Sequence, residues 1–370
     1  MGRQSSSAAR RVVVVVCAAM VVAAAAAQKY NAVYNFGDSI TDTGNLCTNG
    51  RPSQITFTQP PYGETYFGSP TCRCCDGRVV VDFLASKFGL PFLPPSKSTS
   101  ADFKKGANMA ITGATAMDAN FFRSLGLSDK IWNNGPISFQ IQWFQQISSS
   151  VCGQNCKSYL ANSLFVFGEF GGNDYNAMLF GGYSADQAST YTSQIVDTIS
   201  SGVEKLIAMG AVDVVVPGVL PIGCFPIYLT IYGTSSSSDY DSLGCLKKFN
   251  DLSTNHNNQL KTKISALQSK YKSARIMYAD FYSGVYDMDL ARCSRRAAGQ
   301  AAASSTTTTT RGVGCQAHQR APTRRRILAG TASTSPRQLT SRSLTAGSTA
   351  RTVARPSSTA KAKCLERTSH

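Results

Sequence analysis

The C-terminal segment 290–370 lacks aspartate, phenylalanine, tyrosine and tryptophan, and its single acidic residue is Glu366. It consists largely of Ala, Ser, Thr and Arg, with a run of threonines at 306–310. A segment of this composition has too few apolar side chains to build a hydrophobic core. We therefore predict that 290–370 is a disordered tail, which excludes a second folded domain at this end of the chain.

Outside this tail the positive and negative charges nearly balance. The formal net charge is +16, but 290–370 contains 15 Lys and Arg residues against one acid, which leaves about +2 for the rest. The tail also lacks the interleaved aromatic side chains on which bases stack. We therefore expect no nucleic-acid partner, although a basic tail that binds an anionic polymer or a membrane surface remains an alternative.

Long hydrophobic runs are absent after the first 27 residues. Three arginines precede the apolar run Val12–Val22, and Ala25–Ala27 fits an A-x-A cleavage site before Gln28. This pattern predicts a secretory signal peptide over 1–27 and a secreted protein. The alternative, an uncleaved anchor, is disfavoured because a spanning helix needs about 20 apolar residues. We therefore expect no stable membrane insertion.

Cysteine is not scarce, and its use fits secretion. Eight cysteines lie between the signal segment and residue 290, and an even number in a secreted chain indicates disulfides. Cys152 and Cys156 are close enough in sequence to pair, and a Cys224–Cys245 bridge would close a Ser- and Gly-rich excursion. A metal site at Cys72-x-Cys74-Cys75 is disfavoured because no histidine lies nearby. The eight are Cys47, Cys72, Cys74, Cys75, Cys152, Cys156, Cys224 and Cys245.

The body of the chain, 28–289, alternates short β-rich runs with amphipathic helical segments. Several of the runs lack polar alternation, as strands buried on both faces do. This alternation predicts one α/β domain with a mostly parallel sheet and helices on both faces. A segment rich in Pro, Gly and Thr, 49–76, is expected to be a long surface loop. The predicted strands are Ala32–Phe36, Leu164–Gly168, Val212–Val216 and Arg275–Asp280; the predicted helices are Val79–Phe88, Ser138–Ser149, Ala185–Met209 and Leu246–Lys270.

A serine follows the first predicted strand, where open α/β sheets collect their ligands. Residues 36–45 read FGDSITDTGN, and Ser39 is the candidate nucleophile. A serine hydroxyl attacks an ester carbonyl when a base removes its proton and donors hold the developing oxyanion. Taken alone, Ser39 would serve equally well as a helix N-cap.

Two further segments carry candidate oxyanion donors. Residues 106–116 read GANMAITGATA, in which Gly113 would let a backbone N–H approach a ligand closely; close packing of a helix on the sheet is the alternative. Residues 168–175 read GEFGGNDY and follow the strand predicted at Leu164–Gly168. Its Asn173 could supply a neutral side-chain donor, or form an Asn-Asp turn.

In this order the three segments resemble the first three signature blocks of the GDSL, or SGNH, family of serine esterases and lipases. The resemblance implies a three-layer α/β/α sandwich of the flavodoxin-like type that hydrolyses carboxylic esters without cofactor or metal. It assigns Ser39 as nucleophile, and the Ser39 N–H, Gly113 N–H and Asn173 amide as the oxyanion hole. The implied substrate is a small-molecule, lipid or acylated-glycan ester.

Other stretches resemble the plant members of the family, so the resemblance covers roughly residues 30–289. His256 lies within a predicted helix that is also helical in the family, and we interpret it as a structural or surface histidine rather than the base. These stretches are Pro61–Phe67, Asp76–Arg78, Leu220–Cys224 and Phe249–Asn257.

The chain departs from the family where its last block, Asp-x-x-His, belongs. Neither His318 nor His370 has an aspartate three residues upstream. Codons TGG GAC GGC ATC CAC for Trp-Asp-Gly-Ile-His, read one nucleotide late, give Gly-Thr-Ala-Ser-Thr, which is the sequence at 330–334. We hypothesise a change of reading frame near residue 289 that removes the catalytic Asp and His. A non-catalytic protein that binds esters or glycans, or a truncated product, is the alternative to an active hydrolase.

Overall fold

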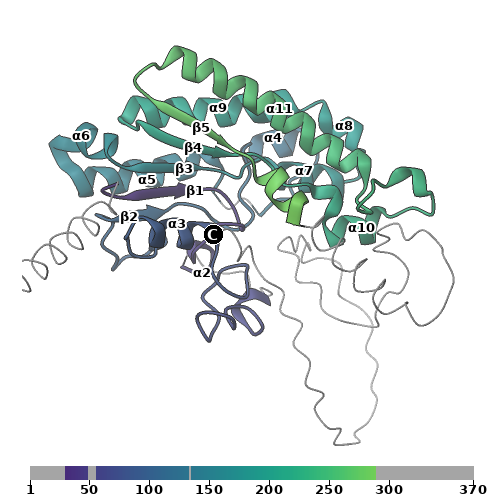
Figure 1. The fold of residues 1–370 in the computed structure, drawn as a ribbon, viewed down its shortest axis with the longest axis horizontal. Coiled ribbons are helices and arrows are strands. Elements are labelled where there is room, and N and C mark those ends of the chain that lie inside the picture. The colour runs from purple at the N-terminus through teal and green to yellow at the C-terminus, as the bar shows by residue number, and fades with distance from the viewer. Residues whose placement is uncertain (1–29, 49–55, 133–134, 289–370) are drawn as a thin grey trace, which may run out of the picture.

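The computed structural model describes residues 30–48, 56–132 and 135–288. These residues form a five-stranded sheet in the order β2-β1-β3-β4-β5, and every neighbouring pair is parallel. This is the flavodoxin-like strand order, and the predicted α/β fold is confirmed (Figure 1). The strands are β1 Val33–Phe36, β2 Gly106–Asn108, β3 Leu164–Phe167, β4 Asp213–Pro217 and β5 Arg275–Ala279.

Four of the strands lie where the sequence placed them, within one or two residues. Strand β2 was not predicted, because it has three residues and begins with a glycine, so it carries no β-rich pattern. It pairs with β1 in the register Val33 to Gly106. The second signature segment therefore begins within a strand.

The four predicted helices are present with small changes in bounds, but one is divided. The segment Ala185–Met209 forms two helices that stop and restart around Thr190 and Tyr191, where the Thr190 hydroxyl donates to the Gln187 carbonyl at 2.7 Å. Side-chain to backbone bonds of this kind compete with a continuing helix. The helices are α2 Asn45–Thr48, α3 Val80–Lys87, α4 Ala119–Ser124, α5 Ile137–Cys152, α6 Cys156–Ala161, α7 Gly172–Phe180, α8 Ala185–Ser189, α9 Thr192–Met209, α10 Pro226–Tyr232 and α11 Lys247–Lys270.

Alternate residues of the central strands face two separate hydrophobic layers, as the period of a β-strand requires. Tyr34 and Phe36 of β1 belong to the larger cluster, which α5, α9 and α11 complete. Val33 of β1 belongs to the smaller cluster, which includes Val81 and Ala85 of α3. Figure 1 shows α9 and α11 along one side of the sheet and α3 on the other.

The α3 side of the sheet is less covered toward β5. Val215 of β4 is only partly buried, and Met277 of β5 is 42 % exposed. On the opposite face of the same strand, Ile276 is buried against α11. Within the described residues, the second helical layer therefore covers β1 and β3 but leaves the β5 edge open.

Three disulfides are described. Cys152–Cys156 and Cys224–Cys245 confirm the two predicted pairs, and Cys47–Cys72 joins α2 to the loop that precedes α3. The predicted use of cysteines in disulfides is confirmed, and Cys74 keeps a free thiol. No group of three or more His, Cys, Asp or Glu in the described part of the chain could hold a metal ion.

The predicted surface loop 49–76 is more deeply packed than its composition indicates. Residues 49–55 lie outside the described residues, whereas Phe57, Tyr62, Arg73 and Cys75 are buried. No helix of the described residues has both the length and the apolarity needed to cross a bilayer. The predicted signal segment 1–27 and tail 290–370 lie outside the described residues.

Candidate active site

The strand order changes direction at β1, where β2 lies on one side and β3 on the other. Ligands of doubly wound sheets bind beyond the carboxyl ends of the strands at such a point. Ser39 follows β1, and the segment Gly168–Asn173 follows β3. The fold thus brings the first and third signature segments to one place, as the sequence predicts.

A glycine allows the chain to turn sharply at the end of β1. Gly37 has φ +139°, and a Cβ at this position would lie 2.9 Å from the carbonyl oxygen of Gly168. The Gln140 side chain holds both backbone groups of Gly37, accepting from its N–H at 2.9 Å and donating to its carbonyl at 2.8 Å. Ser39 lies in the turn that follows, before α2, and is 4 % exposed. Its position is a turn rather than a helix N-terminus, so the N-cap alternative is wrong.

Asp42 joins the first signature segment to the second. Its carboxylate accepts hydrogen bonds from the N–H groups of Gly44 and Asn45, both at 2.7 Å, and from the Thr112 N–H at 2.9 Å and hydroxyl at 3.1 Å. Burial raises the pKa of Asp42, and the backbone donors oppose that shift. The aspartate fixes the loop after β1 against the residue that precedes Gly113.

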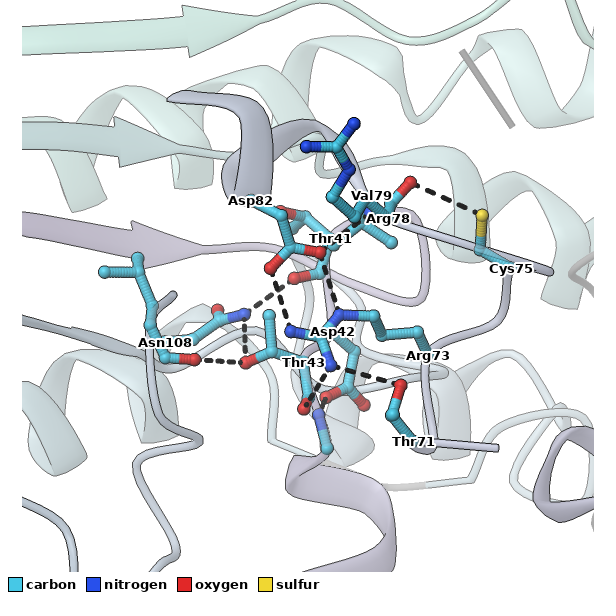
Figure 2. Close-up of polar contacts among 12 residues, drawn as sticks. Thr41, Asp42, Thr43, Thr71, Arg73, Cys75, Arg78, Val79, Asp82 and Asn108 are labelled. Atoms are coloured by element: carbon cyan, nitrogen blue, oxygen red, sulfur yellow. Dashed lines mark hydrogen bonds and ion pairs between the residues drawn. The ribbon is translucent and has the colours of Figure 1, made fainter. Parts of the chain in front are cut away.

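Buried amides hold the same loop from the sheet side. Asn108, at the end of β2, donates to the Thr41 carbonyl at 2.7 Å and to the Thr43 hydroxyl at 2.9 Å (Figure 2). Its side-chain oxygen accepts from Asn35 of β1 at 2.8 Å. Buried polar groups that are paired in this way give a loop one defined conformation.

A buried ion pair fixes the long loop before α3 to this network. Arg73 donates to both carboxylate oxygens of Asp82 at 2.8 Å, and reaches the carbonyl of Thr43 at 3.5 Å and the hydroxyl of Thr71 at 3.2 Å (Figure 2). Asp82 also accepts from the Val79 N–H at 2.9 Å at the start of α3. The end of the loop is therefore part of the scaffold of the site.

Asn173 lies in the first turn of α7 and connects the other two predicted site residues. Its amide donates to the Asp38 carboxylate at 2.8 Å and to the Ala114 carbonyl at 2.9 Å. Asp38 precedes Ser39 and Ala114 follows Gly113, so the three predicted residues lie together. Both amide protons of Asn173 are engaged, and one must be released before the amide can donate to an oxyanion.

Gly113 has the conformation that only glycine adopts easily. Its φ is +83°, and a Cβ there would lie 3.0 Å from Cε3 of Trp132. Both the backbone conformation and the packing of Trp132 therefore favour glycine at this position. The adjacent Thr112 is held by Asp42, and the adjacent Ala114 by Asn173.

Sequence reasoning missed a group of buried carboxyls around these residues. Burial raises the pKa of Asp38 to about 7 and that of Asp174 to about 6, and it raises that of Glu169 well above its usual value. Repulsion between Asp38, Glu169 and Asp174 adds to the shift. Asp174 also accepts from the N–H groups of Ala116 and Met117 at 2.8 and 2.9 Å. The available signal was that Asp38 and Asp174 lie next to site residues in sequence, and that Glu169 lies in the same signature segment as Asn173.

His256 is the one histidine among the described residues, and it is structural, one of the two roles that the sequence predicts. Its Nδ1 lies 2.9 Å from the Tyr175 hydroxyl, and that hydroxyl donates to Thr192. We therefore assign the Nδ1 proton to the bond with Tyr175. The ring is fully buried, Nε2 has no partner, and burial lowers its pKa to about 3. His256 forms no hydrogen bond with Ser39.

Residues 33–301 match the family model described as GDSL-like lipase/acylhydrolase. The chain belongs to the GDSL lipase/acylhydrolase family. It is 40 % identical over 263 residues to a GDSL esterase/lipase of Arabidopsis thaliana, which covers 69 % of this chain and 71 % of that protein. It is 41 % identical over 267 residues to the sinapine esterase of Brassica napus, covering 70 % of this chain and 68 % of that protein.

A second GDSL esterase/lipase of Arabidopsis thaliana is 39 % identical over 261 residues, or 69 % of this chain and 66 % of that protein. By family, the chain is a carboxylic ester hydrolase. The family match ends at residue 301, so most of the basic tail lies beyond it.

Proposed function

We propose that Ser39 is the nucleophile of this GDSL hydrolase, and that the Ser39 N–H, the Gly113 N–H and the Asn173 amide form its oxyanion hole. The observation that carries the proposal is the amide of Asn173, which bridges the neighbours of Ser39 and Gly113 at 2.8 and 2.9 Å. Three segments far apart in sequence converge at the strand ends where α/β sheets bind ligands.

In the proposed reaction the Ser39 hydroxyl adds to the ester carbonyl, and the three donors hold the resulting oxyanion. The C–O bond then breaks, the alcohol leaves with a proton, and Ser39 carries the acyl group. Water attacks the acyl-enzyme, and Ser39 leaves the second tetrahedral intermediate with its proton restored. Both steps need a base, and loss of one oxyanion donor would cost roughly 3–4 kcal/mol of transition-state stabilisation.

The base is the missing component, and we propose that this chain is a poor catalyst for that reason. His256 has its Nδ1 bound to Tyr175 and a pKa of about 3, so it is neutral and held elsewhere. His318 and His370 lie in the tail, without an aspartate three residues upstream. These observations also favour the second candidate function, a non-catalytic protein that binds an ester or a glycan.

We further propose that a change of reading frame near residue 289 removes the Asp-x-x-His block. In the other frame, the codons at positions 331 and 334 would encode the Asp and the His. Sequencing the transcript over this region tests the proposal. It fails if the transcript supports the present frame and the alternative frame lacks the block.

We also propose that 1–27 directs secretion. The Cys47–Cys72 disulfide supports this, because disulfides persist mainly in oxidising compartments.

Labelling with a serine-directed organophosphonate tests the site itself. We expect a chain with the C-terminal frame restored to be labelled at Ser39, and the Ser39→Ala variant to remain unlabelled. Ser163→Ala is the matched control, because Ser163 is also buried but lies before β3, away from the site. Undiminished labelling of Ser39→Ala would refute the assignment.

A further inference from the structure

The chain has two tryptophans, and both lie beside the candidate active site. Trp132 and Trp143 are partly exposed and pack against the same small cluster, which includes Leu46 and Ile111. Leu46 follows the first signature segment and Ile111 lies within the second. An aromatic surface therefore borders the two segments that carry Ser39 and Gly113.

Trp132 lies directly against the proposed oxyanion glycine. A Cβ on Gly113 would lie 3.0 Å from Cε3 and 3.3 Å from Cδ2 of its indole ring. An oxyanion donor lies about 3 Å from the carbonyl oxygen of the reacting ester. Hence a side chain packed on Gly113 is within reach of the group bonded to that carbonyl.

The two tryptophans differ in what already contacts them. The Lys97 ammonium lies 3.7 Å above the Trp143 ring, and the edge of that ring lies against Gly135. Trp132, in contrast, packs its ring on Gly113 and is partly exposed. Lys97 thus covers the ring of Trp143, whereas Trp132 presents an aromatic ring beside Gly113.

We propose that Trp132 contacts the acyl group of the ester, and that this acyl group is a planar aromatic one whose ring packs on the indole. The proposal rests on the proposed function, because it takes Gly113 as an oxyanion donor. The acyl group stays bonded to the reacting carbon through both half-reactions, so a contact beside Gly113 serves acylation and deacylation alike. Aromatic pairing adds to simple burial of the same area, enough for a preference of up to about tenfold over a saturated ring.

Fluorescence of the full chain measures this contact directly, because Trp132 and Trp143 are the sole tryptophans. The probes are methyl benzoate, methyl cyclohexanecarboxylate of similar size, and phenyl acetate, whose ring is on the alcohol side. The measurement uses the Ser39→Ala chain, so that turnover does not interfere. We expect methyl benzoate to bind about tenfold more tightly than either of the other two esters.

Variants assign the effect to one ring. Trp132→Leu should remove the preference, and Trp132→Phe should retain most of it. Trp143→Phe, the matched control, should retain the preference and leave Trp132 as the single reporter. Equal affinity for the three esters, or a preference that survives Trp132→Leu, would overturn the proposal.

Organophosphonate labelling and the ester affinities together separate this proposal from the proposed function. Failure of the organophosphonate to label Ser39 would overturn the nucleophile assignment while a Trp132-dependent preference still stood. Labelling of Ser39 together with equal affinities would leave the hydrolase and refute the aromatic acyl site. If Trp132→Leu fails to fold, Trp143→Phe still decides the outcome, because Trp132 is then the single reporter: a preference seen in its fluorescence supports the proposal, and equal affinities overturn it.

Discussion

Among single residues, Asp38 is a buried acid with a raised pKa that directly precedes the proposed nucleophile. Its carboxylate accepts from the Ile40 N–H at 3.0 Å and the Asn173 amide at 2.8 Å, next to the proposed nucleophile. Burial is the main cause of its raised pKa, and repulsion from Asp42 and Asp174 adds to it. Ionisation of Asp38 should therefore destabilise the folded state, while it strengthens the hydrogen bond that Asp38 accepts from the Asn173 amide.

The stability of the folded chain should depend on pH through Asp38. Its pKa rises from 3.8 to about 7 on folding, so between these values the native state holds a proton that the unfolded state releases. The unfolding free energy contributed by Asp38 is thus present at low pH and is lost as pH rises toward and past 7. We expect the unfolding free energy of the parent chain to fall, relative to that of Asp38→Asn, by at least about 1 kcal/mol between pH 4 and pH 8.

Urea unfolding of the two chains across this pH range measures this gap in unfolding free energy. Taking the difference cancels the opposite contribution of His256, whose lowered pKa stabilises the folded state at high pH and is lost as pH falls toward 3. Asp186→Asn is the matched control for replacing an acid by an amide, because that carboxylate is 82 % exposed. A pH-independent gap for Asp38→Asn would show that the Asp38 carboxyl is not perturbed.

At the scale of elements, the loop before α3 is the least expected part of the scaffold. Its composition indicates a surface loop, yet its Arg73 forms a buried, bidentate ion pair with Asp82 of α3. The pair links the loop, the start of α3 and the backbone of Thr43. Sequence composition could not reveal this, because a buried charge pair depends on which distant residues meet.

Removing one partner of the Arg73–Asp82 ion pair should lower the unfolding free energy. Arg73→Leu leaves the Asp82 carboxylate buried without its cation, and we expect a loss of roughly 3–5 kcal/mol in unfolding free energy. The double variant Arg73→Leu/Asp82→Leu should recover much of the loss, since both charges are gone. Lys248→Ala, which removes an exposed pair with Asp186 at 3.8 Å, should change stability by less than about 1 kcal/mol. Thermal or urea unfolding gives these values, and a small effect of Arg73→Leu would contradict the assigned role.

The sequence predicted the sheet better than it predicted the site. Buried parallel strands such as Leu164–Phe167 have continuous apolar runs, and Lys247–Lys270 has a helical period, so both were visible locally. The position of Gly113 and Asn173 near Ser39 followed from the family resemblance and the strand ends. The bridge from Asn173 to Asp38, the acid cluster and the ring of Trp132 on Gly113 all depend on tertiary contacts, so no local pattern could indicate them.

For the whole molecule, composition predicts a sharp difference between body and tail. The tail has 15 basic residues and no aromatics, so it offers many trypsin sites and no core. We expect limited trypsin digestion to remove it quickly and leave a core that ends between Lys270 and Arg292. Mass spectrometry of the time course identifies the end of the core, and a full-length chain that resists digestion would refute the prediction.

We propose that this chain has the nucleophile and oxyanion donors of a GDSL hydrolase but lacks the base. The most direct test compares hydrolysis of p-nitrophenyl acetate by the chain as given and by the frame-restored chain, which has Asp and His at positions 331 and 334. We predict that restoration raises kcat by roughly 10³-fold or more, and that Ser39→Ala abolishes the gain. Ordinary enzymatic turnover by the unrestored chain that Ser39→Ala abolishes would contradict the account, and His256 would then be the first residue to mutate.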